Sequence, residues 1–132
     1  MRNKILIVEK EVLMLYFLKH RLRKEDFDVD IAVDGREAML LISQNQYDAV
    51  IVDLTLPFMS GFELIFKIRT SENNFATPIL VLSALSDENA IVDAMGVGAN
   101  EFLKKPFATK VLLAVVNKMV SGYNLMPQVY GN

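Results

Sequence analysis

The chain has 132 residues, a length typical of one domain, and 52% of them are hydrophobic, which excludes a disordered segment. Its net charge of −2 gives no positive field for nucleic acid, so we expect no direct nucleic acid binding. The absence of cysteine excludes disulfides and thiolate metal sites. No apolar stretch is long enough to cross a membrane, and no signal-peptide pattern opens the chain, so the sequence predicts a soluble cytoplasmic protein.

Short apolar runs predict five strands. Residues 4–8, 49–52 and 79–82 are apolar on both faces, which is typical of interior strands in a parallel sheet. Residues 28–33 alternate, with acids on one face, and therefore indicate an edge strand. Residues 101–103 predict a short fifth strand that Pro106 limits.

Segments with helical periodicity lie between these runs. They cover residues 11–24, 34–41, 61–69, 86–97 and 108–120, with Asp34 as an N-cap and Gly98 as a C-cap. Gly96 is a weak position at which the fourth helix could fray or end early. Strands that alternate with helices predict an α/β fold, a parallel sheet covered on both faces. We expect residues 1–120 to form the domain and residues 121–132 a tail or the start of a linker.

Polar residues follow several of the predicted strands. Because the carboxyl ends of parallel strands meet at one edge of the sheet, we expect Glu9, Asp53, Ser83 and Lys105 to lie close together there. A carboxylate can act as a nucleophile and form an aspartyl-phosphate. The oxygens of the phosphoryl group would then need donors and positive charge, which Ser83 and Lys105 can supply. Ala84 is small and would leave an approach open.

These residues lie in stretches that, taken together, resemble the receiver domain of bacterial two-component response regulators. The resemblance covers about residues 3 to 120 and rests on five stretches in order: 5–9, 53–61, 82–84, 98–99 and 102–107. It implies a flavodoxin-like (βα)5 three-layer sandwich with a five-stranded parallel sheet in the order 2-1-3-4-5. It also implies a non-enzymatic signalling module in a phosphorelay, with the bond between Lys105 and Pro106 in the cis form.

The resemblance assigns roles to individual residues. Asp53 resembles the phosphoacceptor, which takes a phosphoryl group from a sensor histidine kinase or a phosphotransfer protein. Ser83 resembles the switch hydroxyl, with Ala84 beside it, and Phe102 occupies the position of the switch aromatic residue. Lys105 resembles the lysine that pairs with the phosphate.

The same resemblance implies a Mg²⁺ site and an output surface. Glu9 and Asp53 would supply carboxylates to the metal, and Thr55 its backbone carbonyl. The output surface of the family lies on the fourth helix, the fifth strand and the fifth helix, where a downstream protein or domain would bind and where a homodimer could form. The fifth predicted helix, residues 108–120, is more apolar than one buried face requires, which favours a partner on that surface.

Lys10 departs from the family pattern, which has two consecutive acids after the first strand. A shift of register that used Glu11 instead would disturb the start of the first helix, so we do not favour it. Glu9, Lys10, Asp53 and Lys105 together carry no net charge. An ion pair between Lys10 and Asp53, worth ~4 kcal/mol at ~4 Å before desolvation, would compete with the metal. We therefore hypothesise that Mg²⁺ binding is weak or absent and that the protein is a pseudo-receiver, which signals through binding alone; a Lys10 side chain turned into solvent would leave a metal bound by Glu9 and Asp53.

Two other functions are compatible with parts of the pattern. A phosphatase with an aspartate nucleophile would need a second acid two residues after Asp53, where this chain has Thr55. A flavodoxin-like cofactor binder would need a phosphate-binding loop of small polar residues after the first strand, where this chain has Glu9, Lys10 and Glu11. Both residue sets argue against these alternatives.

Overall fold

The computed structural model describes residues 2–85 and 87–122, and most of the predicted tail lies outside them. Strands and helices alternate along this part of the chain: β1 (Lys4–Val8), α1 (Val12–Lys24), β2 (Asp28–Ala32), α2 (Gly35–Gln44), β3 (Ala49–Val52), α3 (Gly61–Arg69), β4 (Ile79–Ser83), α4 (Glu88–Val97), β5 (Glu101–Lys104) and α5 (Thr109–Val120). None of these helices is both long and apolar enough to cross a membrane.

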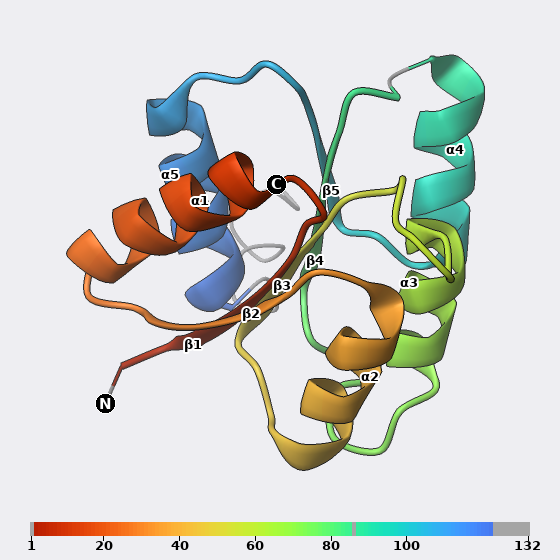
Figure 1. Cartoon of the computed structure of the whole chain (residues 1–132), viewed down its shortest axis with the longest axis horizontal. Helices are drawn as coiled ribbons and strands as arrows, with labels where there is room; N and C mark the ends of the chain where they lie inside the picture. The colour runs from red at the N-terminus through yellow and green to blue at the C-terminus, as the bar shows by residue number, and fades with distance from the viewer. Residues whose placement is uncertain (1, 86, 123–132) are drawn as a thin grey trace, which may run out of the picture.

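The five strands form one parallel sheet in the order β2-β1-β3-β4-β5. Helices α1 and α5 cover one face of the sheet, and α2, α3 and α4 cover the other (Figure 1). The predicted α/β class, three-layer arrangement and strand order are confirmed. Strand β2 lies at an edge of the sheet, as its alternating pattern predicts.

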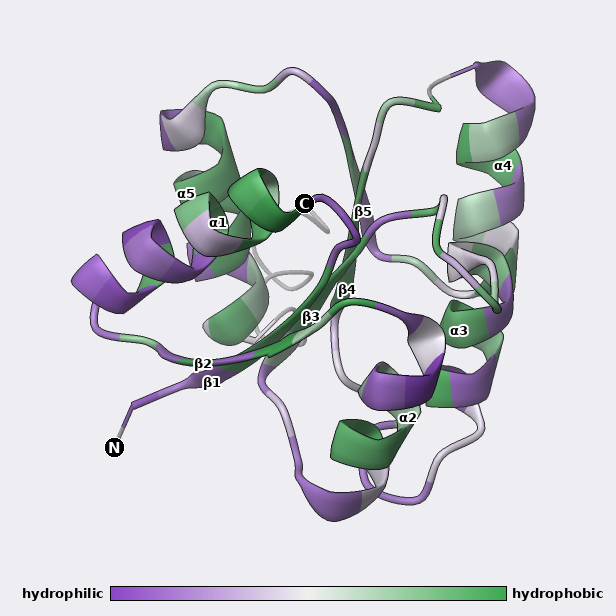
Figure 2. Ribbon diagram, in the orientation of Figure 1, coloured by the Kyte–Doolittle hydropathy of each residue, from purple (hydrophilic) through white to green (hydrophobic). Residues whose placement is uncertain are grey.

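Each face of the sheet has its own hydrophobic core. In β1, Leu6 and Val8 pack into the core under α2, α3 and α4, whereas Ile5 and Ile7 pack into the core under α1 and α5. The hydrophobic colouring runs along the central strands, and the end of α1 is hydrophilic (Figure 2). Two-sided burial explains why the interior strands are continuous apolar runs.

Side-chain caps account for the starts of three of the five helices that the structure describes. Asp34, Ser60 and Asp87 each accept a hydrogen bond from a backbone N–H in the first turn of the helix that follows. Helix α2 extends to Gln44, three residues beyond the predicted end. Helix α4 continues through Gly96 to Val97, so the early end considered for this helix does not occur.

Candidate functional site

Backbone hydrogen bonds place the predicted site residues at the carboxyl edge of the sheet. The N–H of Glu9 donates to the carbonyl of Ala32 (3.1 Å), and the N–H of Asp53 donates to the carbonyl of Val8 (3.0 Å). The N–H of Lys105 donates in the same way to the carbonyl of Ser83 (2.9 Å). Each bond continues the parallel ladder just beyond a strand end. The sheet itself therefore fixes where these three side chains begin.

The Lys105 ammonium lies among three carboxylates. Its Nζ donates to Oε1 of Glu9 at 2.7 Å, to Oδ2 of Asp53 at 2.8 Å and to Oε1 of Glu11 at 3.2 Å. The distances to Glu9 and Asp53 are typical of charge-assisted hydrogen bonds, and the distance to Glu11 is longer. The acidic pocket, defined here as Glu9, Glu11, Asp53 and Lys105, thus joins the end of β1 to the loops after β3 and β5.

Most of this pocket is shielded from solvent. Glu9 is 2% exposed and Asp53 is 5% exposed. Burial raises the pKa of the Glu9 carboxyl, although its hydrogen bonds with Lys105 and the Glu11 N–H oppose that effect. Burial alone would lower the pKa of the Lys105 ammonium, but the hydrogen bonds to Asp53 and Glu9 outweigh it and raise that pKa. Lys105 is therefore held in its charged form, as a donor to the acids.

Glu11, which the sequence argument set aside, belongs to the pocket. Using Glu11 does not disturb the first helix, because α1 begins at Val12 and Glu11 precedes it as an extended N-cap residue. The Glu11 side chain makes no capping hydrogen bond and instead reaches Lys105. Its backbone N–H donates to Oε2 of Glu9 (3.1 Å), which holds the turn between the two acids. The premise that excluded Glu11 is therefore wrong.

Lys10 has no contact with this pocket among the interactions of the described residues. It is exposed, and its ammonium forms no ion pair with any residue that the structure describes. The expected ion pair between Lys10 and Asp53 is absent, since Asp53 pairs with Lys105 instead. The pocket therefore contains three carboxylates and one ammonium, with a formal charge of −2. The sequence-based count, which included Lys10 in place of Glu11, is zero.

The three carboxylates are close enough to share a cation. Ligand oxygens of Glu9, Glu11 and Asp53 all lie within 4.8 Å of one another. Carboxylate oxygens are the ligand type that Mg²⁺ prefers. The Glu11 side chain is 60% exposed, in contrast to the two buried acids, so its position is held less firmly. The residues present therefore fit a small divalent cation, with one weakly fixed member.

The loop after Asp53 folds back onto this residue. The N–H of Thr55 donates to Oδ1 of Asp53 (3.0 Å), and the N–H of Gly61 donates to the carbonyl of Leu54 (2.8 Å). A Cβ at Gly61 would collide with the backbone carbonyl of Asp53 and lie 2.6 Å from Cα of Leu54. Glycine is thus required where α3 starts, because the helix passes directly against the backbone of Asp53 and Leu54.

Of the predicted switch residues, Ser83 and Ala84 lie at the carboxyl end of β4, whereas Phe102 pairs with Val81 inside the sheet. Ser83, the last residue of β4, is fully buried, and its Oγ accepts a hydrogen bond from the N–H of Leu85 (3.0 Å). Ala84 is exposed beside it. Phe102 is half-buried in β5 and packs against the core under α2, α3 and α4. The bond between Lys105 and Pro106 is cis, as predicted.

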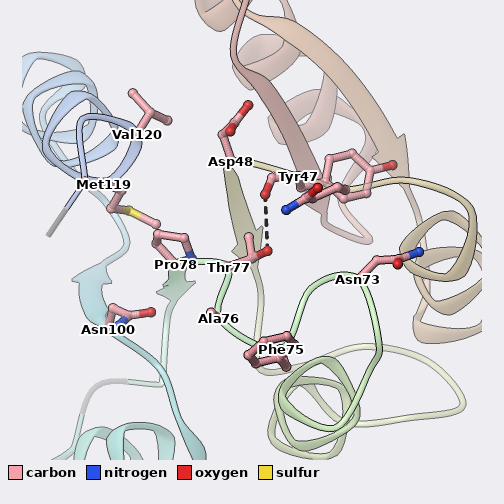
Figure 3. Close-up of a pocket in the computed structure, with 12 residues that line it drawn as sticks. Tyr47, Asp48, Asn73, Phe75, Ala76, Thr77, Pro78, Asn100, Met119 and Val120 are labelled. Atoms are coloured by element: carbon pink, nitrogen blue, oxygen red, sulfur yellow. Dashed lines mark hydrogen bonds between the residues drawn. The ribbon is translucent and has the colours of Figure 1, made fainter. Parts of the chain in front are cut away.

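A hollow of about 420 Å³ lies at the amino ends of the strands, which form the edge of the sheet opposite these residues (Figure 3). It is lined by residues that precede β3, β4 and β5, among them Tyr47, Thr77 and Asn100. In Figure 3 the hydroxyl of Thr77 donates to the carbonyl of Tyr47, at 3.1 Å. None of the predicted site residues lines this hollow, so it is separate from the acidic pocket.

Related sequences support the family that the pocket suggests. Residues 5–117 match the family described as the response regulator receiver domain. Response regulator ArlR of Staphylococcus saprophyticus is 38% identical over 118 residues, which cover 89% of this chain and 52% of ArlR. The two-component response regulator PhoP of Pseudomonas aeruginosa is 35% identical over 117 residues, which cover 89% of this chain and 51% of PhoP. The chain thus spans about half the length of these curated relatives.

Solved structures agree with the sequence relatives. Chemotaxis protein CheY4 of Vibrio cholerae superposes with a TM-score of 0.86 at 29% identity, over 90% of this chain and 99% of that one. The receiver domain of sensor histidine kinase PA1611 from Pseudomonas aeruginosa has a TM-score of 0.85 at 26% identity, over 92% of this chain and 100% of that one, and its structure holds a magnesium ion in the active-site cleft. Pocket, fold and relatives lead to one conclusion: this chain belongs to the response regulator receiver domain family of two-component signalling.

Proposed function

We propose that this receiver domain accepts a phosphoryl group on Asp53 from a sensor histidine kinase or a phosphotransfer protein. The observation that carries the proposal is the Lys105 ammonium, 2.8 Å from Oδ2 of Asp53 inside a buried acidic pocket. In the transfer, a carboxylate oxygen of Asp53 forms a bond to phosphorus as the bond between phosphorus and the donor's histidine nitrogen breaks. The Lys105 cation stabilises the negative charge that the phosphoryl oxygens bring into the pocket.

Mg²⁺ would be held in this pocket by Glu9, Glu11 and Asp53, together with the backbone carbonyl of Thr55. When bound, such an ion neutralises charge on a phosphoryl group and helps to orient it. We infer weakened rather than abolished metal binding, because Glu11 stands in for the missing acid but is 60% exposed. The ordering of this side chain costs conformational entropy that a buried ligand would already have lost.

Phosphorylation would then act on the surface formed by α4, β5 and α5. The hydroxyl of Ser83 would leave the N–H of Leu85 and donate to a phosphoryl oxygen, and the exposed position of Ala84 leaves room for that approach. Phe102, which is only half-buried, would rotate inward as Ser83 moves. A downstream output protein or domain, or a second copy of the chain, would bind the altered surface, without direct contact between this chain and nucleic acid.

This role is one of a signalling module rather than of an enzyme. Thr55 occupies the position at which an aspartate-nucleophile phosphatase carries its general acid, and its N–H is used to hold Asp53. Residues 1–120 would constitute the receiver domain, with residues 121–132 as a tail or the start of a linker. The last described helix, α5, ends at Val120 in agreement with that boundary.

Intact-mass spectrometry tests the proposal. The protein is incubated with a small-molecule phosphodonor, with and without Mg²⁺, beside the Asp53→Asn variant. We expect wild type to gain one phosphoryl group in a Mg²⁺-dependent way and Asp53→Asn to gain none. If wild type stays unmodified at every Mg²⁺ concentration, the transfer is refuted, and a pseudo-receiver that signals through binding alone becomes the better account.

A further inference from the structure

The loop between Asp53 and α3 contains a strained turn. Phe58 has a φ of 70°, and the N–H of Met59 donates to the carbonyl of Pro57 at 2.8 Å, which closes a three-residue γ-turn. Turns of this kind with positive φ are rare, because the Cβ of the central residue crowds the backbone. Among the described residues other than glycine, only Asp26 shares a positive φ, and aspartate tolerates that region far better than phenylalanine. Something must therefore hold Phe58 in place.

The start of α2 supplies that support. The guanidinium carbon of Arg36 lies 3.7 Å from the centroid of the Phe58 ring, within the range of a cation–π contact. Burial does not explain the conformation, because Phe58 is 73% exposed. Arg36 also lies near Asp34, whose Oδ2 is 3.9 Å from Nη2 of Arg36. Asp34 in turn caps α2 by accepting a hydrogen bond from the N–H of Glu37, which fixes the Asp34 carboxylate beside Arg36.

The next residue of the loop contacts the same helix. A Cβ at Gly35 would lie 2.8 Å from Sδ and 2.9 Å from Cβ of Met59, which shows that Met59 packs directly against the backbone of Gly35. Two successive loop residues, Phe58 and Met59, thus contact two successive residues of α2, Gly35 and Arg36. We call these four residues the loop brace.

Both ends of the same loop contact Asp53. At one end the N–H of Thr55 donates to Oδ1 of Asp53, and at the other Gly61 passes against the Asp53 backbone. We propose that Arg36 is a positioning residue: by stacking on Phe58 it holds the strained turn, and so keeps the Thr55 N–H on the Asp53 carboxylate. This inference rests on the proposed function, since it assigns Arg36 an indirect part in phosphoryl transfer to Asp53.

A double-mutant cycle tests the brace. Glycine adopts a positive φ without steric cost, so Phe58→Gly removes both the strain and the need for Arg36. Wild type, Arg36→Ala, Phe58→Gly and the double variant are compared by amide hydrogen exchange over residues 54–60 and by the initial rate of Asp53 labelling. We expect Arg36→Ala in the wild-type background to speed exchange, and to slow labelling, by about two- to fivefold, the range of an exposed cation–π contact. In the Phe58→Gly background we expect the same substitution to change neither.

The control variants separate stacking from charge and from general effects. Arg36→Lys keeps the cation but lacks the planar group, and it should recover part of both rates. Phe75→Ala removes another exposed aromatic side chain, at the far edge of the sheet, and should leave exchange at residues 54–60 unchanged. Equal effects of Arg36→Ala in both Phe58 backgrounds, or unchanged exchange in Arg36→Ala, would overturn the brace. Amide hydrogen exchange needs no phosphorylation. Failure to label wild type would therefore refute the proposed function, while the exchange rates would still show whether Arg36 holds the turn at Phe58.

Discussion

Polar side chains are buried at both edges of the sheet, but they are used differently. At the carboxyl edge Lys105 pairs with three carboxylates, one of them largely exposed, so the pocket keeps a surplus of negative charge. At the amino edge Asn74 is 1% exposed and neutral: its Oδ1 accepts from the Tyr47 N–H, and its Nδ2 donates to the carbonyls of Ile42 and Asn45. The carboxyl edge carries charged groups whose balance a bound ligand can change. At the amino edge, the amide oxygen and nitrogen of Asn74 already have hydrogen-bond partners within the protein.

Arg69 adds further hydrogen bonds within the protein at the amino edge. Its guanidinium donates to the carbonyls of Phe75, Thr77 and Gly98 and to the side chain of Asn100. It thus joins the end of α3 to the start of β4 and to the turn between α4 and β5. Substitutions at this edge should therefore change stability and spare the chemistry, whereas substitutions at exposed residues of the carboxyl edge, such as Glu11, should change the chemistry with little loss of stability.

The largest effect on stability is expected from Asn74→Ala. Removal of the amide leaves the N–H of Tyr47 and two carbonyls without partners in a buried site, at a cost of about 2–4 kcal/mol in the free energy of unfolding. Urea denaturation measures this loss, and Asn73→Ala, at an exposed neighbour, should change stability far less. Labelling of Asp53 in the folded protein should persist. A variant that is as stable as wild type would break the contrast between the two edges.

Gly98→Ala should destabilise the amino edge by a smaller amount. Gly98 has a φ of 122°, and a Cβ there would lie 2.8 Å from Cγ of Arg69. Both the backbone conformation and the contact oppose a side chain, so we expect a loss of about 1–3 kcal/mol. Thermal unfolding checks the value, and an unchanged melting temperature would contradict the role assigned to Arg69 and Gly98.

Gly96→Ala, two residues earlier on α4, should have the opposite sign. A Cβ at Gly96 would meet no atom within 4 Å, so alanine fits without strain. We expect a gain of about 0.5 kcal/mol from the higher helix propensity of alanine. The same thermal unfolding experiment measures it, and destabilisation would show that α4 needs glycine for a reason other than packing.

The smallest effect on stability is expected at the carboxyl edge, from Lys10→Gln. Lys10 is exposed and pairs with no described acid, so the free energy of unfolding should change by less than about 0.5 kcal/mol. Urea denaturation of this variant beside wild type gives the comparison. A large change would mean that Lys10 interacts with the pocket after all.

The sequence predicts the fold well because the signals are local and agree with one another. Continuous apolar runs identify the interior strands, and Asp34 and Gly98 mark helix ends where the structure has them. The convergence of Glu9, Asp53 and Lys105 follows from parallel pairing alone. The direction of two adjacent side chains could not be predicted this way. Whether Lys10 or Glu11 faces the pocket depends on the residue at which α1 begins, and helix starts are the least certain part of a pattern.

The brace was missed for a related reason. Phe58 carries no sequence signal for a positive φ, and its contact with Arg36 joins the loop before α3 to the start of α2, 22 residues earlier in the chain. Glycine or asparagine at this position would have suggested the turn, whereas phenylalanine conceals it.

The most direct test of the central claim, that Glu11 takes the place of the acid missing at Lys10, is a Mg²⁺ titration by isothermal calorimetry. Wild type is compared with Glu11→Gln and with Lys10→Gln, a matched pair of neutral substitutions at adjacent residues. We predict that Glu11→Gln weakens Mg²⁺ binding about tenfold, as expected for the loss of one nearby charge, and that Lys10→Gln changes it less than about twofold. Unchanged binding in Glu11→Gln together with much tighter binding in Lys10→Gln would contradict the account and restore Lys10 as the residue that impairs the metal site.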